Sequence, residues 1–254
     1  MRTLSQPSFA AVITLALFGT VGVAGAQTTT PPTTRSYIQV VRLKPDMVNE
    51  WVALQKDEVI PAQKKAGVTS RITLVTMVGN SFEYTVITPF PSWSAMDGDA
   101  PLTRALGAAG AAALNAKVRK CIMTQTTFLA SRQDELSIAA AGEALVWRTT
   151  VRRAMPGKMQ EYLAFYKAAV VPALQKAKAD GKIAGSVLST RGVGALSREL
   201  TATTLYNKFA DLDGPNPVVA VVGADSATAI GAKTDLLTTT GQTYVRRRIA
   251  DLSY

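Results

Sequence analysis

Short segments in which hydrophobic and polar residues alternate are separated, along this chain, by segments with the hydrophobic spacing of helices. In the first half, alternating runs predict β-strands at residues 37–43, 71–78, 82–88 and 122–132. Helical spacing predicts a helix from Pro45 or Asp46 to Gly67, with Pro61 as a kink or a new first turn. An Ala-rich helix is predicted over residues 102–118.

The second half repeats this order. Strands are predicted at residues 145–153, 186–191, 199–206 and 240–249, and helices up to Gly181 and over residues 218–234. The segment 93–101, with an aromatic residue, an Asp-Gly pair and a proline, returns 116 positions later as residues 209–217. In the first helices Pro61 and Pro172 correspond at an offset of 111. Turn residues and prolines that recur at nearly constant offsets indicate a duplicated unit.

Each unit is expected to form a four-stranded antiparallel sheet with both helices on one face, which is an α+β fold of ferredoxin-like type. The other face of each sheet would be bare, so we expect the two sheets to pack face to face. The predicted boundaries are 36–137 for the first repeat, 138–143 for a linker and 144–254 for the second repeat.

The N-terminal segment has a pattern typical of a targeting signal. Arg2 precedes an apolar run over residues 9–23 and the small residues Ala24-Gly25-Ala26, which predicts a secretory signal peptide over residues 1–26. The alternative is an uncleaved membrane anchor, because the apolar run is nearly long enough to span a bilayer. Residues 27–35 are polar and proline-rich, and we expect them to be a disordered lead-in. The sequence thus predicts a periplasmic or secreted protein without a stable membrane anchor after cleavage.

The amino-acid composition excludes several classes of cofactor, metal site and catalytic group. The chain has no histidine, which excludes imidazole-bound haem or zinc and any triad with a histidine base, so no cofactor and no metal site is expected. Cys121 is the only cysteine, and its apolar neighbours predict a buried strand residue rather than a nucleophile. The chain is basic, with 28 Lys and Arg against 18 Asp and Glu. Because these charges are spread out and no recognition motif is present, the run Arg246-Arg247-Arg248 does not predict a nucleic-acid partner.

Two corresponding segments carry a family resemblance. The run YIQVVRLKPDMVNEWVALQKDEVIPAQKKAG and its echo LVWRTTVRRAMPGKMQEYLAFYKAAVVPALQKAKADG resemble the opening of NIPSNAP-type domains of the dimeric α+β barrel superfamily. The resemblance spans residues 36–254 and implies a monomeric pseudo-dimer, with further self-association left open. Relatives include cofactor-independent monooxygenases, haem enzymes and proteins of no known chemistry. The chain departs from the pattern in lacking the proximal histidine of the haem branch and in having Asp46 where Gly157 stands in the second copy.

Strand alternation suggests a candidate ligand site between the sheets. It places Ile38, Val40 and Val151 against the helices and turns arginines of the second copy to the opposite face. Arginines on an enclosed surface suit carboxylate or phosphate groups. The predicted anion cleft consists of Arg148, Arg152, Tyr206, Tyr244, Arg246 and Arg248. The alternative is that these arginines pair with Glu83, Glu199 or Asp251, or face water.

Two functions are therefore open. The first is an exported, non-catalytic binding or scaffold protein that accepts a small anionic or amphipathic molecule between the sheets. The second is a cofactor-independent monooxygenase-like enzyme acting on a small aromatic substrate. Its apolar pocket would be lined by Trp93, Trp147, Tyr84 and Tyr206, for which the alternative is packing in the core or on a hairpin. No catalytic residue is assigned, and the balance favours a protein that is not an enzyme.

Overall fold

The strands lie close to the positions that the alternation predicts. The computed structural model describes residues 34–254. The predicted signal peptide and most of the predicted lead-in lie outside the described residues. The strands are β1 (Arg35–Leu43), β2 (Ile72–Val78), β3 (Glu83–Pro89), β4 (Ile122–Arg132), β5 (Val146–Ala154), β6 (Gly185–Arg191), β7 (Glu199–Tyr206) and β8 (Thr238–Arg248).

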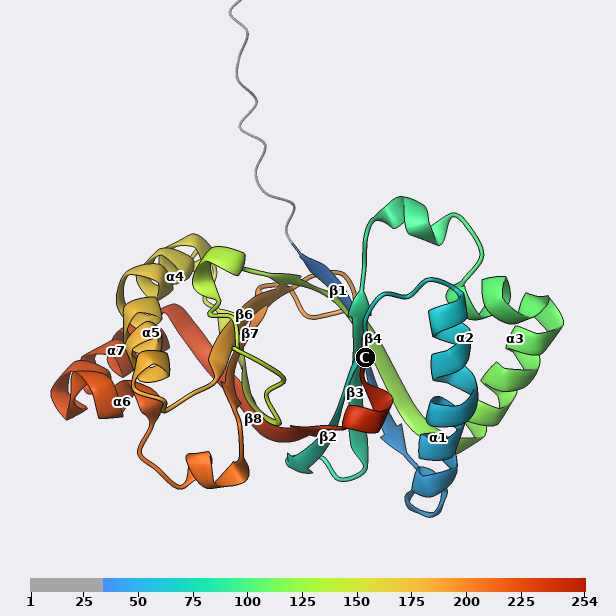
Figure 1. Cartoon of the computed structure of the whole chain (residues 1–254). Helices are drawn as coiled ribbons and strands as arrows, with labels where there is room; N and C mark the ends of the chain where they lie inside the picture. The colour runs from blue at the N-terminus through green and yellow to red at the C-terminus, as the bar shows by residue number, and fades with distance from the viewer. Residues whose placement is uncertain (1–33) are drawn as a thin grey trace, which may run out of the picture. The chain divides into compact units, whose positions relative to one another are not determined.

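These strands form one closed antiparallel barrel (Figure 1), in the order β1-β3-β2-β8-β5-β7-β6-β4. Each half keeps the same internal order, β4-β1-β3-β2 in the first and β8-β5-β7-β6 in the second. The halves meet at two hydrogen-bonded seams, β2 with β8 and β4 with β6. The prediction of two separate sheets packed face to face is corrected on this point. Joining the edges satisfies backbone groups that two open sheets would leave unpaired.

Helices cover the outside of the barrel on both sides (Figure 1). In the first half they are α1 (Val48–Leu54), α2 (Ile60–Lys65) and α3 (Pro101–Cys121). In the second half they are α4 (Met159–Phe165), α5 (Val171–Ala179), α6 (Pro217–Val222) and α7 (Ala224–Leu237). Short 3-10 turns follow several of the strands.

One π-helical turn precedes each of the two equivalent prolines. Residues Gln55–Val59 connect α1 to α2, and Tyr166–Val170 connect α4 to α5. Proline offers no N–H and its ring crowds the carbonyl four residues earlier, so a wider turn lets the helix continue past it. Pro61 and Pro172 therefore stand at the start of a renewed α-helical turn, one of the two roles that the sequence allowed for Pro61.

The second helix of each half is interrupted at the same place. Gly107 breaks α3 with φ 72° and ψ 168°, and Gly223 separates α6 from α7 with φ 82° and ψ 166°. Such a positive φ is accessible to glycine at little cost. The predicted continuous helix over residues 218–234 is thus two helices, since this conformation ends the first one.

Each half has its own hydrophobic core between sheet and helices. The first core includes Val41, Leu43 and Trp51, and the second includes Val146, Leu188 and Leu200, all almost fully buried. Cys121 belongs to the first core, as the last residue of α3 and not in a strand as predicted. Burial raises the pKa of the Cys121 thiol, which is consistent with a packing role.

The side-chain faces of β1 are the reverse of those predicted. Val41 and Leu43 pack under the helices, whereas Val40 lines the barrel interior and Ile38 packs there on Phe128. The placement of Ile38 and Val40 against the helices is therefore wrong. Apolar residues occupy both faces of β1, because a closed barrel buries both, and a register error of one residue exchanges the faces.

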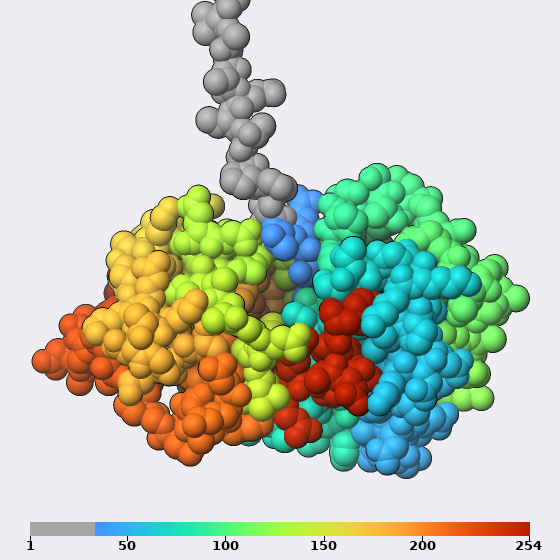
Figure 2. All heavy atoms as spheres, viewed as in Figure 1, coloured from blue at the N-terminus to red at the C-terminus, as the bar shows by residue number. Residues whose placement is uncertain are grey.

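The segment after the last strand of each half docks on the other half. Leu136, which follows β4, is buried in the core of the second half, and residue 138 forms a β-bridge with Ser186. Leu252, which follows β8, is fully buried in the core of the first half. Figure 2 shows the C-terminal residues, in red, on the surface against the cyan segment of the first half. These two exchanged tails add to the seams that hold the halves together.

Within residues 34–254, no helix combines the length and apolar character needed to cross a membrane.

Candidate functional site

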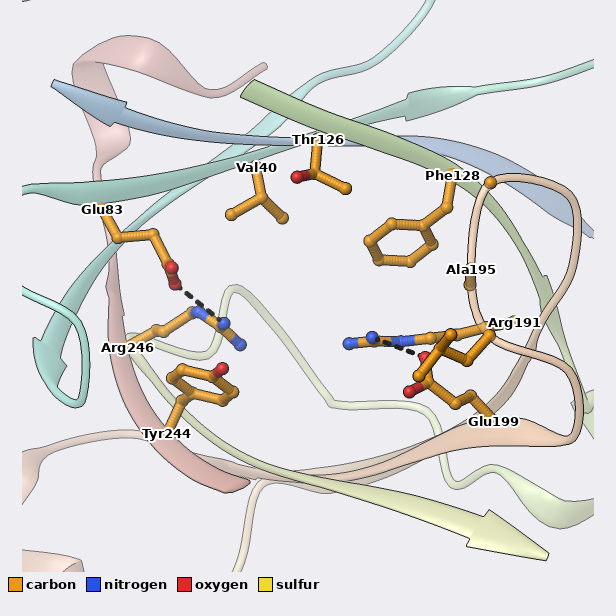
Figure 3. A pocket seen from close by; sticks show the side chains of 11 residues that line it. Val40, Glu83, Thr126, Phe128, Arg191, Ala195, Glu199, Tyr244 and Arg246 are labelled. Atoms are coloured by element: carbon orange, nitrogen blue, oxygen red, sulfur yellow. Dashed lines mark hydrogen bonds and ion pairs between the residues drawn. The ribbon is translucent and has the colours of Figure 1, made fainter. Parts of the chain in front are cut away.

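The barrel interior contains a cavity of about 270 Å³ (Figure 3). Both halves contribute to its wall, with apolar side chains on one side and charged side chains that reach in from opposite ends. The lining residues are Val40, Glu83, Thr126, Phe128, Arg191, Gly194, Ala195, Leu196, Glu199, Tyr244 and Arg246.

The first charged group, which we call the Arg246 cluster, consists of Glu83, Tyr244 and Arg246. Nη2 of Arg246 donates to Oε1 of Glu83 at 3.3 Å, and both side chains are 8% exposed. The guanidinium lies over the Tyr244 ring, 4.2 Å from its centroid. Glu83 also accepts hydrogen bonds from the Thr76 hydroxyl and the Asn80 amide. Glu83 is thus held by three donors.

The second charged group, the Arg191 cluster, consists of Phe128, Arg191 and Glu199. Nη1 of Arg191 donates to Oε2 of Glu199 at 3.2 Å, with the two side chains 18% and 14% exposed. The guanidinium lies 4.5 Å from the centroid of the Phe128 ring. Among the described residues no further donor contacts the Glu199 carboxylate. This cluster is therefore the more open and less saturated of the two.

The two clusters are related by the internal repeat. Glu83 and Glu199 differ by 116 positions, and so do Phe128 and Tyr244. The arginines do not correspond in this way. Arg246 lies in β8 opposite Thr76 of β2, and Arg191 lies in β6 opposite Ala130 of β4. Each seam therefore brings one arginine, from the second half, to face a small residue of the first half.

Electrostatics couple the clusters. Burial lowers the pKa of Arg246, the Glu83 carboxylate raises it, and repulsion from Arg191 lowers it further. The two guanidinium groups therefore interact electrostatically across the cavity. The Nε atoms of both arginines are buried and have no hydrogen-bond partner within the described residues. The site therefore has more donors than its two carboxylates satisfy.

Glycines let two hairpins approach the aromatic residues of the clusters. A Cβ on Gly79, where φ is +132°, would lie 2.7 Å from Cδ1 of Tyr244. A Cβ on Gly194, where φ is +89°, would lie 2.3 Å from the carbonyl oxygen of Thr127 and 2.9 Å from Cα of Phe128. The β2–β3 and β6–β7 hairpins thus cover equivalent ends of the cavity, and their contact requires the missing side chain.

Of the six residues predicted for the anion cleft, only Tyr244 and Arg246 line the cavity. Arg248 is on the same face of β8 but forms an ion pair with Glu143 in the predicted linker, through both Nη atoms. Its side chain is 11% exposed. Arg246 and Arg248 are thus paired with acids, as the alternative to an anion cleft predicted. Arg246 pairs with Glu83, one of the predicted partners, whereas Arg248 pairs with Glu143, which was not among them.

The other three predicted residues lie outside the barrel interior, which corrects the predicted face of β5. Arg148 is opposite Val245, which packs on the core of the second half. Arg152 donates to the hydroxyls of Thr238 and Thr240 and lies 3.9 Å from Asp235 of α7. The physical reason is the one found for β1: both faces of a barrel strand are buried, so alternation alone does not identify the inner one.

Tyr206 also lies on the helix side. It is 2% exposed within the core of the second half. Burial raises the pKa of its hydroxyl, and the neighbouring Arg148 partly opposes that rise. The predicted anion cleft is therefore divided between the two faces of the sheet.

None of the aromatic residues considered for an apolar pocket lines the cavity. Tyr84 packs against Trp51 in the first core, 4.8 Å between ring centroids. Trp93 is 51% exposed and packs edge-on against Phe90. Trp147 donates from its indole nitrogen to the carbonyl of Ala144. The aromatic rings of the cavity are instead Phe128 and Tyr244.

Arg191 was not among the residues predicted from the sequence, and Glu83 and Glu199 were considered only as competing partners of the arginines. The offset of 116 between the two glutamates was a usable signal. The role of Arg191 was not visible, because it depends on the closure of the β4–β6 seam.

The site offers hydrogen-bond donors, two carboxylates and apolar walls. No group of three or more Cys, Asp or Glu suited to a metal ion occurs among residues 34–254. The arrangement can bind a small molecule with an apolar body and acceptor atoms, and its carboxylates can accept a proton.

No protein-family model matches the chain, and no curated protein matches its sequence. Solved structures match its fold. A "putative monooxygenase" from Lactobacillus acidophilus NCFM is similar with a TM-score of 0.57 at 14% identity, over 87% of this chain and 95% of that one. An anthrone oxidase-like protein is similar with a TM-score of 0.55 at 8% identity, over 86% and 92%.

A second "putative monooxygenase", from Fusobacterium nucleatum subsp. nucleatum, has a TM-score of 0.55 at 8% identity, over 86% of this chain and 94% of that one. The structural neighbours are thus monooxygenase-like folds of the dimeric α+β barrel type. At these identities the likeness concerns the fold.

Proposed function

We propose that this protein binds a small amphipathic molecule inside its barrel. The observation that carries the proposal is the cavity itself, in which apolar walls stand beside two arginines that each donate a single side-chain hydrogen bond to a carboxylate within the described residues. Ligand sites combine such walls with a few polar groups that fix orientation. Core packing alone would not call for two ion pairs in this position, because burying charges is costly.

The size of the cavity limits the ligand. About 270 Å³ is near the lower end of the range for small-molecule sites, roughly 300–1,000 Å³. A molecule of one or two rings fits this volume. The guanidinium groups stacked on Phe128 and Tyr244 favour a planar ligand with acceptor atoms at one end.

Binding is tested by screening one- and two-ring aromatic compounds with ligand-observed NMR and calorimetry. Ala195 lines the cavity, and Ala195→Phe should fill it and abolish binding. Val193, on the same hairpin but 65% exposed, provides the matched control Val193→Phe, which should bind as the wild type does. Unchanged binding in Ala195→Phe, or no binding of any compound by the wild type, would refute an interior site.

A second candidate is cofactor-independent oxygenation of a phenolic or similar aromatic substrate. It is supported by the names of the structural neighbours and by a carboxylate beside a guanidinium in one cavity. Glu199 has fewer donors than Glu83 and would accept the substrate proton, while Arg191 would stabilise the resulting anion.

In such a reaction the substrate supplies the electrons. A ring CH₂ group and O₂ give a carbonyl group and water, so one oxygen atom enters the substrate and the other leaves as water. Oxygen uptake by metal-free protein measures this directly. Glu199→Gln should abolish uptake but keep binding, and Glu58→Gln, in an exposed ion pair with Lys117, should change neither. No substrate-dependent uptake by the wild type would leave binding as the function.

We further propose that the chain is an exported, NIPSNAP-like tandem of ferredoxin-like units that acts as a monomeric pseudo-dimer. The equal strand order of the halves and the offsets of 111 and 116 support the tandem origin. The signal-like segment 1–26 supports export. Expression of the full chain followed by mass measurement of the extracytoplasmic protein tests this, since cleavage after Ala26 leaves Gln27 as the first residue. An intact N-terminus in a membrane fraction would contradict it.

A further inference from the structure

Two guanidinium groups point at one another across the cavity (Figure 3). Arg246 comes from β8 and Arg191 from β6, and each has its carboxylate partner beside it rather than between them. Arg191 lowers the pKa of Arg246, as expected for like charges that face each other. The groups that face this space from the two ends are therefore both cations, although the two clusters together have no net charge.

Both guanidinium groups have donors to spare. A guanidinium has five N–H groups. Within the described residues, Arg246 makes a hydrogen bond only to Glu83, and Arg191 only to Glu199. Arg246 is 7% exposed, so its remaining donors lie in the interior. Unsatisfied buried donors call for acceptor atoms in the same space.

The surroundings hold these donors in place. Arg191 is stacked on Phe128 and Arg246 on Tyr244, so a ring covers one face of each guanidinium. One Nη atom of each guanidinium is also held by an ion pair with a carboxylate. A pair of positioned, planar donor groups matches a planar acceptor group such as a carboxylate. Val40 and Ala195 leave apolar room beside this space for the body of a ligand.

We infer that the ligand is a small aromatic monocarboxylate whose carboxylate lies between Arg191 and Arg246. This inference rests on the proposed interior binding site and names its ligand class. One negative charge relieves the repulsion between the arginines. A second charge would face Glu83 and Glu199, and a cation would face the two arginines.

Benzoate is the probe, with benzyl alcohol as neutral analogue, benzylamine as cation, and acetate and inorganic phosphate as anions without a ring. Calorimetry at fixed ionic strength should show benzoate binding at least about 10-fold more tightly than benzyl alcohol, the effect expected for a charge-assisted hydrogen bond. Benzylamine should not bind. Acetate and phosphate should bind more weakly than benzoate, because the ring adds apolar contact.

Arg191 is the residue to change, because it is the less buried arginine and its loss leaves Glu199 partly hydrated. Arg191→Gln should remove the preference for benzoate and keep the affinity for benzyl alcohol. The control is Arg247→Gln, which removes the same charge from the next position of β8, on the opposite face from Arg246. It should keep the preference. Circular dichroism checks that both variants fold.

The outcomes separate the two proposals. Equal affinity for benzoate and benzyl alcohol overturns the monocarboxylate and leaves interior binding standing. Acetate or phosphate binding as tightly as benzoate overturns the aromatic class and indicates a simple anion site. If no aromatic probe binds, the proposed function fails as well. A benzoate preference that survives in Arg191→Gln removes Arg191 from the site and refutes the bridging geometry.

Discussion

Gly194 shows how closely one residue of this barrel is constrained. Its φ of +89° is unfavourable for other residues, and a Cβ there would lie 2.3 Å from the carbonyl oxygen of Thr127. We predict that Gly194→Ala loses about 1–3 kcal/mol in urea unfolding, the usual cost of overpacking. The control is Gly231→Ala in α7, where no atom is near; it should gain about 0.5–1 kcal/mol from helix propensity. Equal stability of Gly194→Ala and the wild type would mean that the hairpin shifts freely.

Arg71 is a buried cation that forms no ion pair with an acidic side chain among residues 34–254. It is 1% exposed and donates to the amide oxygens of Gln55 and Gln63 and to the hydroxyl of Thr73. Burial lowers the pKa of Arg71 to about 10. The cation thus stays charged at neutral pH, and the acceptors of its side-chain hydrogen bonds are neutral oxygens.

We predict that Arg71→Met lowers the free energy of unfolding by about 1–3 kcal/mol, since the buried amide oxygen of Gln55 and the half-buried one of Gln63 lose their donor. The triple variant with Gln55→Leu and Gln63→Leu should recover part of that loss, because it removes the unpaired acceptors too. Thermal unfolding measures both. A triple variant less stable than the single one would show that the amides matter for reasons other than Arg71.

At the scale of elements, Glu161 connects two helices. Its carboxylate accepts from Lys158 of the preceding turn and from Lys233 of α7, both at about 3 Å. These hydrogen bonds lower the pKa of Glu161 from 4.5 to about 2. A lowered pKa in the folded state means that the stabilisation is present above pH 4.5 and is lost as the pH falls from 4.5 towards 2.

We therefore predict that Glu161→Gln flattens the loss of stability between about pH 4.5 and 2, as followed by urea unfolding at a series of pH values. Glu50 holds the equivalent position in the first half and forms no ion pair within the described residues. Glu50→Gln should leave the acid profile unchanged. Identical acid profiles for the wild type and Glu161→Gln would contradict the bridge between α4 and α7.

The elements also show what sequence reasoning could reach. Strand positions followed from alternation, and β4 and β7 begin and end where predicted. The faces of β1 and β5 did not follow, because Val41 is buried under the helices while Val40 is half-buried on the opposite side, in the barrel interior. In β8 the alternation succeeded, since Val245 and Tyr244 differ clearly in environment. Of the six residues predicted for the site, Tyr244 and Arg246 line the cavity, whereas the contribution of Arg191 depends on a seam between distant segments.

At the scale of the whole molecule, the two halves are connected by an exchange of their C-terminal segments. Each half completes the core of the other with the segment that follows its own last strand. Leu136 enters the second core and Leu252 the first. The C-terminal segment is also fixed by backbone hydrogen bonds between Arg71 and Tyr254 in both directions. The two halves should therefore unfold together and not as independent domains.

Because the segment after the last strand of each half packs in the core of the other half, a substitution in that segment should destabilise the other half. Leu252→Ala should lower the free energy of unfolding by about 2–5 kcal/mol, as for other buried leucines. Hydrogen exchange should rise first in Val48–Leu54 and Ile60–Lys65, although the substitution follows the last strand of the second half. Leu136→Ala, the matched variant 116 positions earlier, should loosen Met159–Phe165 and Val171–Ala179 instead. If each variant loosened mainly the helices of its own half, the tails would be surface attachments, and the coupling of the halves would rest on the two seams alone.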